Sequence, residues 1–581
     1  MNEQSAFSAS AYPEELSQQA TPTYGALASV AQFSGVFLLF CAATAGFFWE
    51  WMPHLQSALL GPPEDNMQDF WNTWYAAFAR EPGRFFFTDL IRFPEGTPLI
   101  YHSFAYPQVF AVALISKVFG LGASSAILQQ NLTLLLAFPL AGTGAFYLVR
   151  HFAHNTAGAL LGGFVFAFNP SHIEQVMHHA HVAQTEFIPF FVLAFVLALE
   201  KKSMLLLLSA IALYALSALS CWYYLFYVAY FMVFHTAYVS IRDRSLPRGW
   251  QLATPLACVA GVVALLSPLL VPMLRTATGG APVYKAGTDI YVADVFAYPA
   301  FPPFHLLSQL SQPIYGHLGA NAWETTVYLG VFNVVALTWL WYAGGAKEKK
   351  LLAYLLCGMV VFCIFASGDS LHVLGHHTIP MPQAVLSHLP FFKNVRTPSR
   401  AIVFVYLFIA IGVGSAIALA LRSPPRHIGR WGVAVMAALI VLDFFPARPL
   451  PMTARICSPG LDVIRDDPEK GFGVLDLPSG RPVEYVPGNL YMFQQTCHGR
   501  PIAQGNTSRD LIVSLRDRVE TEDFDTQRRQ LVSAKVKYIV INHQPMGMPL
   551  KWHPEDGSQD RYRSFYPAAY DGPDLTVLRV Y

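Results

Sequence analysis

The chain has 581 residues, of which 54% are hydrophobic and only 13% are charged. Soluble domains carry about 25% charged residues, so this composition excludes an ordinary soluble protein and predicts an α-helical polytopic membrane protein. The formal net charge of +1 gives no basis for a nucleic-acid partner.

Residues 1–29 are polar and rich in Ser, Ala, Gln and Pro, so we expect a disordered N-terminal tail. Residues 30–446 carry successive apolar runs and are predicted to form the membrane domain. A helix needs about 20 residues to cross a bilayer, and the shorter runs would borrow flanking residues. We expect about 11 spans, at residues 30–51, 126–149, 157–168, 182–199, 204–219, 222–239, 252–274, 326–342, 351–366, 401–421 and 431–445.

Basic residues predict the orientation of these spans, because loops rich in Lys and Arg favour the cytoplasm. Such loops occur at residues 150, 201–202, 242–248, 347–350 and 422–430. The N-terminus is therefore predicted to lie in the cytoplasm and the C-terminus outside it. Residues 104–119 are also apolar, but a span there would invert every later loop. We expect a juxtamembrane or re-entrant helix on the outer side instead.

The first outer loop, predicted as residues 52–125, places three carboxylates within six residues, namely Glu64, Asp65 and Asp69. Aromatic residues that prefer a membrane interface follow, among them Trp71. Carboxylates at such a boundary suit deprotonation of a hydroxyl or binding of a divalent metal. The alternative is a solvated, turn-forming loop.

A second polar cluster follows the apolar run 157–168. Four histidines and one glutamate lie within ten residues, namely His172, Glu174, His178, His179 and His181. Polar groups at membrane depth are costly, which favours a water-filled cavity or a functional site. The alternatives are an interfacial loop with solvated histidines and a transition-metal site, although the spacing matches no known zinc pattern.

Arg396 and Arg400 lie at the outer mouth of the predicted span 401–421. Arginine binds phosphate bidentately better than lysine does, so these two residues are candidates for a phosphate clamp. The alternative is that both side chains simply reach towards the membrane interface.

Charged residues return after residue 446, and short β-type runs occur at 473–477, 536–541 and 575–581. Residues 447–581 are therefore predicted to form a small extracytoplasmic α/β domain. Only two of the seven cysteines, Cys457 and Cys497, lie in polar sequence. Outside the cytoplasm they could form a disulfide.

Several of these motifs together resemble a bacterial branch of the polytopic GT-C glycosyltransferase superfamily. The resemblance is carried by Asp65 and Asp69 before Trp71 and Trp74, by residues 93–96, by residues 166–170 with the histidine cluster, by residues 396–400, and by residues 475–478 and 491–501.

The resemblance implies inverting transfer of a sugar from a polyprenyl-phosphate donor to a lipid, glycan or protein acceptor. It places this reaction on the outer face of a bacterial cytoplasmic (inner) membrane. It implies a first-loop base, either Asp65 or Asp69 with Glu64 beside them, and a donor phosphate on Arg396 and Arg400. We expect the substrate cleft to be lined by Trp71, His102, His172, Glu174, His178 and His181. No cofactor is required by this reasoning; a metal at Asp65 and Asp69 would be Mg²⁺ or Mn²⁺.

Two other functions fit the same residues. One is a transporter or flippase of lipid-linked glycans, although transporters are often built from repeated halves and the sequence shows no repeat. The other is a non-catalytic scaffold of the same fold.

Overall fold

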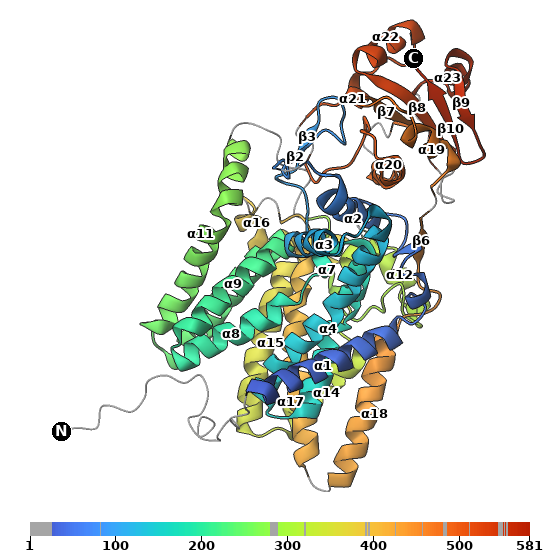
Figure 1. Ribbon diagram of the computed structural model, residues 1–581. Helices are drawn as coiled ribbons and strands as arrows, with labels where there is room; N and C mark the ends of the chain where they lie inside the picture. Colours follow the sequence, from blue (N-terminus) through green and yellow to red (C-terminus); the bar gives the residue numbers. More distant parts are fainter. Residues whose placement is uncertain are drawn as a thin grey trace, which may run out of the picture.

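The computed structural model describes residues 26–81, 83–278, 289–318, 321–389, 392, 395–423, 426–455, 457–479, 485–509, 512–543, 550, 552 and 556–581. Most of the tail predicted to be disordered, residues 1–25, lies outside this description. The described residues form a bundle of long helices with a small α/β domain at one end (Figure 1).

Each apolar run predicted to span the membrane forms a helix. These helices are α1 (Ala26–Phe47), α4 (Ala126–Ala153), α5 (Thr156–Ala167), α8 (Phe187–Lys201), α9 (Met204–Ser220), α10 (Trp222–Asp243), α11 (Trp250–Thr278), α14 (Val331–Ala343), α15 (Ala346–Ala366), α17 (Ile402–Arg422) and α18 (Arg426–Phe444). Within the described residues, 7 helices are long and apolar enough to cross a membrane. The chain is therefore a multi-pass membrane protein by composition and helix length.

Helix α17 forms the centre of the bundle, because almost its whole length is buried. Small residues allow its close packing. A Cβ atom added at Gly158 of α5 would lie 2.2 Å from the carbonyl oxygen of Gly414 in α17. The two backbones thus touch directly, which fixes α5 and the polar segment that follows it.

Helix α3 (Tyr106–Phe119) contains 14 residues, a length of about 21 Å at 1.5 Å per residue. This is shorter than a hydrocarbon core of about 30 Å. Figure 1 shows α3 at the end of the bundle, beside α2 (Asp65–Trp74). Helices α5 and α14 are shorter still, with 12 and 13 residues, so length alone does not separate α3 from the predicted spans, and its juxtamembrane position stays a prediction.

Short elements connect the helices at this end of the bundle. They are β1 (Ala58–Leu60), the π-helical turn η3 (Tyr75–Ala79), β2 (Phe87–Thr88), β3 (Thr97–Pro98), α6 (Pro170–His178), α7 (Ala180–Ala183), α12 (Gln312–Tyr315), α13 (Ala322–Thr325), β4 (Ser370–Val373), β5 (His376–Pro380) and α16 (Pro382–Leu386).

The C-terminal domain is built on a four-stranded sheet in the order β7-β8-β10-β9, in which β7 and β8 are parallel and the other pairs antiparallel. The predicted strands are confirmed as β7 (Gly473–Leu477), β8 (Val536–Asn542) and β10 (Leu575–Arg579). Its other elements are β6 (Met452–Ala454), α19 (Pro459–Arg465), α20 (Tyr485–His498), α21 (Leu515–Arg518), α22 (Phe524–Ser533), α23 (Gln559–Phe565) and β9 (Ala568–Asp571).

The first outer loop and the C-terminal domain share one hydrophobic core. Met67, Phe70 and Trp71 of α2 pack in the same buried cluster as Leu490 and Tyr491 of α20. Strand β1 also pairs with β6 in an antiparallel ladder. Helix α2 is consequently held between the bundle and the C-terminal domain (Figure 1).

Cys457 and Cys497 form a disulfide, which confirms the pairing considered from the sequence. It joins the segment after β6 to the end of α20, across a sequence separation of 40 residues. Closing a loop of this length stabilises a fold by about 4 kcal/mol.

We expect Cys497→Ser to lower the melting temperature of the detergent-purified protein and to remove the sensitivity of that temperature to a reductant. Cys357→Ser, which changes an exposed free cysteine, serves as the matched control. Equal melting temperatures for the two variants would contradict the stabilising role of the disulfide.

Candidate functional site

A close approach between the first outer loop and the histidine cluster positions the candidate site. Gly61 follows β1 with a φ of +98°, and a Cβ atom there would lie 2.0 Å from the carbonyl oxygen of Met177. Only glycine fits such a contact and such a φ. The contact brings the N-terminus of α2, with its carboxylates, against the C-terminal end of α6.

Four ionisable side chains form a continuous chain of contacts across this junction. His179 Nε2 lies 3.1 Å from Asp65 Oδ2 and 3.4 Å from Glu324 Oε1. Arg400 donates through both Nε and Nη2 to the Glu324 carboxylate. Arg400 and Glu324 are buried, while the Asp65 side chain is 42% exposed. The chain thus runs from the buried bundle to an accessible carboxylate.

The pairing keeps both carboxylates ionised. Burial raises the pKa of Asp65, but His179 and Asn489 of α20 bond to this carboxylate and bring its pKa to about 2. Burial likewise raises the pKa of Glu324, and Arg400 with His179 brings it to about 2. Asp65 is therefore an anion at every physiological pH and only a weak proton acceptor.

His178 forms a second acidic pairing beside the first. Its Nδ1 lies 3.3 Å from Glu64 Oε2, and its Nε2 lies 3.5 Å from Glu174 Oε2. The ring stacks on Trp323, with 4.7 Å between centroids. Burial lowers the pKa of His178, but the two glutamates outweigh this and raise it to about 9. His178 is therefore protonated, as an imidazolium, at neutral pH.

Asp69 lies one turn of α2 beyond Asp65 and lines a small polar pocket. Its Oδ2 accepts a hydrogen bond of 2.6 Å from the backbone N–H of Ala180, and its Oδ1 lies 3.9 Å from His181 Nδ1. The pocket is lined by polar residues of α2, α3, α4 and α7, among them Asn72, Gln108, Gln130, His181 and Gln184. The pocket, of about 10 Å³, has room for about one water molecule, so a single hydroxyl group that entered it would lie within reach of the Asp69 carboxylate.

The structure places other predicted residues away from this junction. His172 is buried and its two ring nitrogens lie 2.6 and 2.8 Å from the carbonyl oxygens of Ala167 and Ala183. Burial lowers its pKa to about 4, so one nitrogen donates and the residue ties α6 to α7. Trp71 is fully buried, and its Nε1 donates to Gln495 Oε1 at 2.7 Å.

His102 is buried between α2 and the C-terminal domain. Its Nε2 lies 2.7 Å from Asn72 Oδ1, and its Nδ1 accepts a hydrogen bond from the backbone N–H of Ser508. Burial lowers its pKa to about 3, so the ring is neutral and braces this interface.

Arg396 is half-buried at the same end of the bundle, and its guanidinium carbon lies 5.9 Å from the centre of the Tyr291 ring. Its charge is close enough to lower the pKa of Glu324. The Arg400 side chain, in contrast, is only 7% exposed. Of the two predicted phosphate ligands, Arg396 is thus the more accessible one.

Sequence reasoning missed the two residues at the centre of the site. His179 and Glu324 join the first-loop carboxylate to Arg400, yet neither was singled out as a site residue. The position of Glu324 directly before an apolar run, after Trp323, is the one signal that could have identified it.

His179 Nδ1 and His181 Nδ1 are buried, and neither has a hydrogen-bond partner within the described part of the chain. His179 faces Asp65 through its other nitrogen, Nε2. The described residues of this junction do not bring three ligand atoms within 4.8 Å of one another, so a metal at Asp65 and Asp69 stays a prediction.

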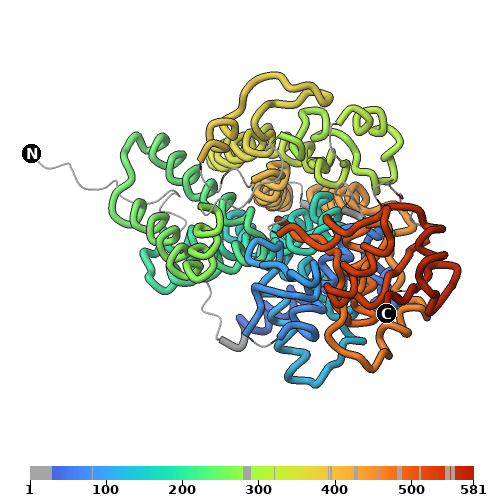
Figure 2. The backbone as a smooth tube through the Cα atoms, turned by 90° about the horizontal axis from the view of Figure 1, so that it is seen from above, coloured from blue at the N-terminus to red at the C-terminus, as the bar shows by residue number. Residues whose placement is uncertain are grey.

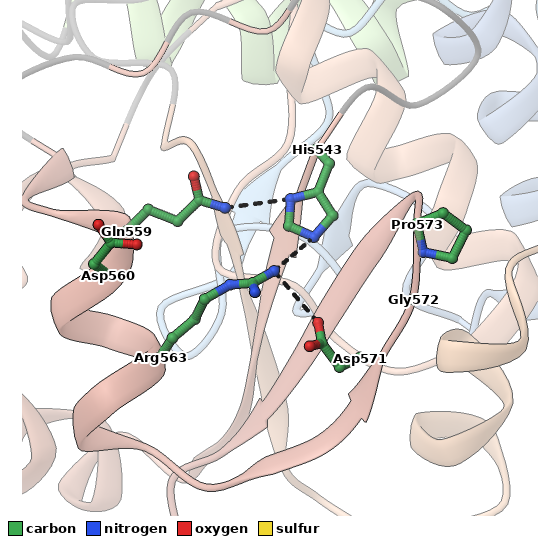
Figure 3. Close-up of a pocket in the computed structure, with 7 residues that line it drawn as sticks. All are labelled: His543, Gln559, Asp560, Arg563, Asp571, Gly572 and Pro573. Atoms are coloured by element: carbon green, nitrogen blue, oxygen red, sulfur yellow. Dashed lines mark hydrogen bonds and ion pairs between the residues drawn. The ribbon is translucent and has the colours of Figure 1, made fainter.

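A separate open pocket lies on the C-terminal domain, between α23 and β9 (Figure 3). Arg563 bridges His543 Nε2 at 3.1 Å and Asp571 Oδ1 at 3.3 Å. Figure 1 shows α23 and β9 farther from the helix bundle than α20. This pocket therefore contributes nothing to the chain of charges at Asp65.

Comparison with known proteins gives a family match and a fold likeness. Residues 39–446 match the family described as Domain of unknown function (DUF6311). No curated protein sequence matches the chain.

Three solved structures of the Archaeoglobus fulgidus oligosaccharyltransferase are similar to this one. The structure tethered with an acceptor peptide containing the NVT sequon is 10% identical, covers 88% of this chain and 69% of that chain, and has a TM-score of 0.50. The structure of AglB in complex with an inhibitory peptide and a dolichol-phosphate is 11% identical. The match covers 89% of this chain and 70% of that chain, with a TM-score of 0.47. The structure in complex with Zn and sulfate is 11% identical. The match covers 88% of this chain and 68% of that chain, with a TM-score of 0.43. At this identity the likeness shows a GT-C-like fold alone.

We expect Gly61→Ala to destabilise the protein by more than about 3 kcal/mol. Alanine would be strained at this positive φ, and its Cβ atom would clash with the Met177 carbonyl oxygen. The matched control is Gly120→Ala. Gly120 has a φ of +62° with nothing within 4 Å of its added Cβ atom, and its replacement should cost about 1–2 kcal/mol. Denaturation in detergent measures both, and equal losses would refute the close approach.

The pairing of His178 predicts a pH dependence of stability. Its folded pKa of about 9 lies above the unfolded value of 6.5, so its contribution is complete below pH 6.5 and disappears as the pH rises through 9. At 1.36 kcal/mol per pKa unit the loss is on the order of 3 kcal/mol. We expect His178→Gln to abolish this loss in detergent denaturation, and His54→Gln, at an exposed histidine, to retain it. A wild-type stability that stays level from pH 6 to 9.5 would contradict the pairing.

Proposed function

The chain belongs to the DUF6311 family, and we propose that it is a GT-C-type membrane glycosyltransferase. It would transfer a sugar from a polyprenyl-phosphate donor to a lipid, glycan or protein acceptor on the outer face of a bacterial cytoplasmic membrane. The single observation that carries this proposal is the chain of contacts from Asp65 through His179 and Glu324 to Arg400, at the end of a GT-C-like bundle.

The two ends of this chain suit the two halves of a glycosyl transfer. An acceptor hydroxyl must lose a proton, and a phosphate must leave with its negative charge stabilised. Carboxylates gather at one end and guanidinium groups at the other. His179 and Glu324 hold the two ends together in a fixed arrangement.

We assign the role of base to Asp69 and an orienting role to Asp65. Asp69 lines the polar pocket, whereas the pKa of Asp65 near 2 makes it a weak proton acceptor. The acceptor hydroxyl would give its proton to Asp69 as its oxygen bonds to the anomeric carbon. The bond from that carbon to the phosphate oxygen would break on the opposite side, which inverts the configuration.

The leaving polyprenyl phosphate would be stabilised by Arg396, with Arg400 holding Glu324 and the local positive charge in place. A divalent cation such as Mn²⁺ or Mg²⁺, bound at Asp65, would supply further charge stabilisation at the phosphate and leave Asp69 free to act as the base. His178, as an imidazolium, would add positive charge beside Glu64.

The test is a transfer assay in proteoliposomes with a panel of polyprenyl-phosphate sugars. Release of polyprenyl phosphate by the wild-type protein is expected, and Asp69→Asn should slow it by about 10²–10⁴-fold, the usual contribution of a general base. The matched control is Glu81→Gln, which neutralises an exposed carboxylate of the same loop and should leave the rate unchanged.

Other outcomes would assign a different class. Movement of an intact lipid-linked glycan across the bilayer, without release of polyprenyl phosphate, would overturn transfer in favour of a flippase. Donor binding without turnover or translocation would favour a scaffold. Equal rates for wild type and Asp69→Asn would refute the base assignment while leaving the enzyme class standing.

A further inference from the structure

A second group of metal-ligating side chains lies apart from the site above, on the β4–β5 hairpin and the segment beside it. Asp289, His372 and His377 place one ligand atom each within 4.8 Å of one another, and they are the one such set of three among the described residues. Figure 2 shows the segment after residue 289 running next to the segment around residue 375 at the edge of the molecule. We propose that these three residues bind a zinc-type divalent metal ion.

The hairpin is built to bring its two histidines together. Leu374 and Gly375 form a tight two-residue turn with φ values of 50° and 78°, which fixes the register of β4 against β5. In this register His372 lies directly opposite His377, so both imidazoles stand on the same face of the ladder. Their ring centres are 4.2 Å apart.

The third ligand is held in place by the start of the same hairpin. Asp289 accepts hydrogen bonds of 3.0 Å from the backbone N–H of Ser370 and 2.7 Å from its hydroxyl. Its carboxylate then lies between the histidines, with Oδ1 3.3 Å from His372 Nε2 and Oδ2 2.7 Å from His377 Nδ1. Ligand atoms of a tetrahedral zinc ion lie about 3.3 Å apart at bond lengths of about 2.0–2.1 Å. The His372 separation matches this value, and the exposed His377 would have to move outwards by about 0.6 Å from its 2.7 Å contact.

An unpartnered nitrogen supplies independent evidence for a ligand. His372 is only 6% exposed, and its buried Nε2 makes no well-formed hydrogen bond among the described residues, although Asp289 Oδ1 lies 3.3 Å away. A buried polar atom whose hydrogen bond is poorly formed is destabilising. A metal ion shared with Asp289 and His377 would remove this cost.

The donor set identifies the class of ion. Two imidazoles and one carboxylate suit zinc and other later first-row metals, whereas Mg²⁺ and Ca²⁺ prefer oxygen ligands. The His377 side chain is 61% exposed, so water can complete the coordination and the ion can enter from solvent.

The proposed ion would also stabilise the phosphate end of the candidate site. Two residues after Asp289, the Tyr291 carbonyl accepts a hydrogen bond from the Ser399 N–H, and the Tyr291 ring lies against Arg396. Gly375 in the hairpin turn donates to Asp294 Oδ2 at 2.9 Å. Fixing Asp289 to the hairpin would therefore fix the segment that supports Arg396. Metal binding itself does not depend on the proposed transferase function.

The test measures zinc binding by the full-length protein in detergent, after removal of metal with a chelator. Competition titration should show that His372→Ala and His377→Ala lower zinc affinity at least about 100-fold and remove about one equivalent per chain. The matched control is His376→Ala, an exposed histidine on the same hairpin, which should bind as the wild type does. Cobalt bound to the wild-type protein should give tetrahedral absorption bands that His377→Ala lacks.

The same titration in an Asp65→Asn background separates this site from the Asp65 junction, because the equivalent lost with His377→Ala should still be lost there. Equal zinc binding by wild type, His377→Ala and His376→Ala would overturn the proposal. So would cobalt bands that persist in His377→Ala. If His372→Ala does not fold, His377→Ala decides whether the proposed zinc site exists, because His377 is exposed and its replacement should not disturb folding.

Discussion

The end of the helix bundle brings several ionisable side chains into a region with little water, and their mutual pairing is the constraint on which this region depends. A buried carboxylate or guanidinium without its partner would be strongly destabilising. Glu324 is acceptable there because Arg400 bonds to it on one side and His179 on the other. This pairing dictates that the loop before α14, the histidine cluster and the start of α17 meet at one point.

The same constraint explains why the charged side chains at the buried end of the junction are paired, while those nearer the surface are more exposed. Arg400 and Glu324 are buried and neutralise one another, whereas Asp65 is partly exposed and Arg396 is half-buried. The inner pair holds the geometry, and the outer groups retain charge for a ligand. The proposed transfer reaction would use both properties, because it needs a fixed geometry and charge at the phosphate.

Much of the fold could be predicted because local sequence patterns determine its helices and strands. Apolar runs gave the helices, and β-type runs gave β7, β8 and β10, while the short and partly exposed β9 left no such pattern. For the candidate site, the sequence singled out the first-loop carboxylates and Arg400 because charges stand out in apolar sequence, and the structure brings Asp65 and Arg400 into one chain of contacts. The role of Asn489 was not predictable, since only the docking of α20 on α2 brings it 2.8 Å from Asp65. Trp71 was misleading for the same reason, because an aromatic residue beside carboxylates gave no sign of its burial against Gln495.

The core shared by α2 and α20 has a consequence for the biogenesis of the protein. Met67, Phe70 and Trp71 are made early, but the residues that cover them, such as Leu490 and Tyr491, emerge only after all the spans have been synthesised. Contacts so distant in sequence form late, and uncovered apolar surface invites aggregation in the meantime. The apolar face of α2 therefore stays uncovered until the last quarter of the chain has been synthesised, and a chaperone or the bilayer surface would have to shield it in the meantime.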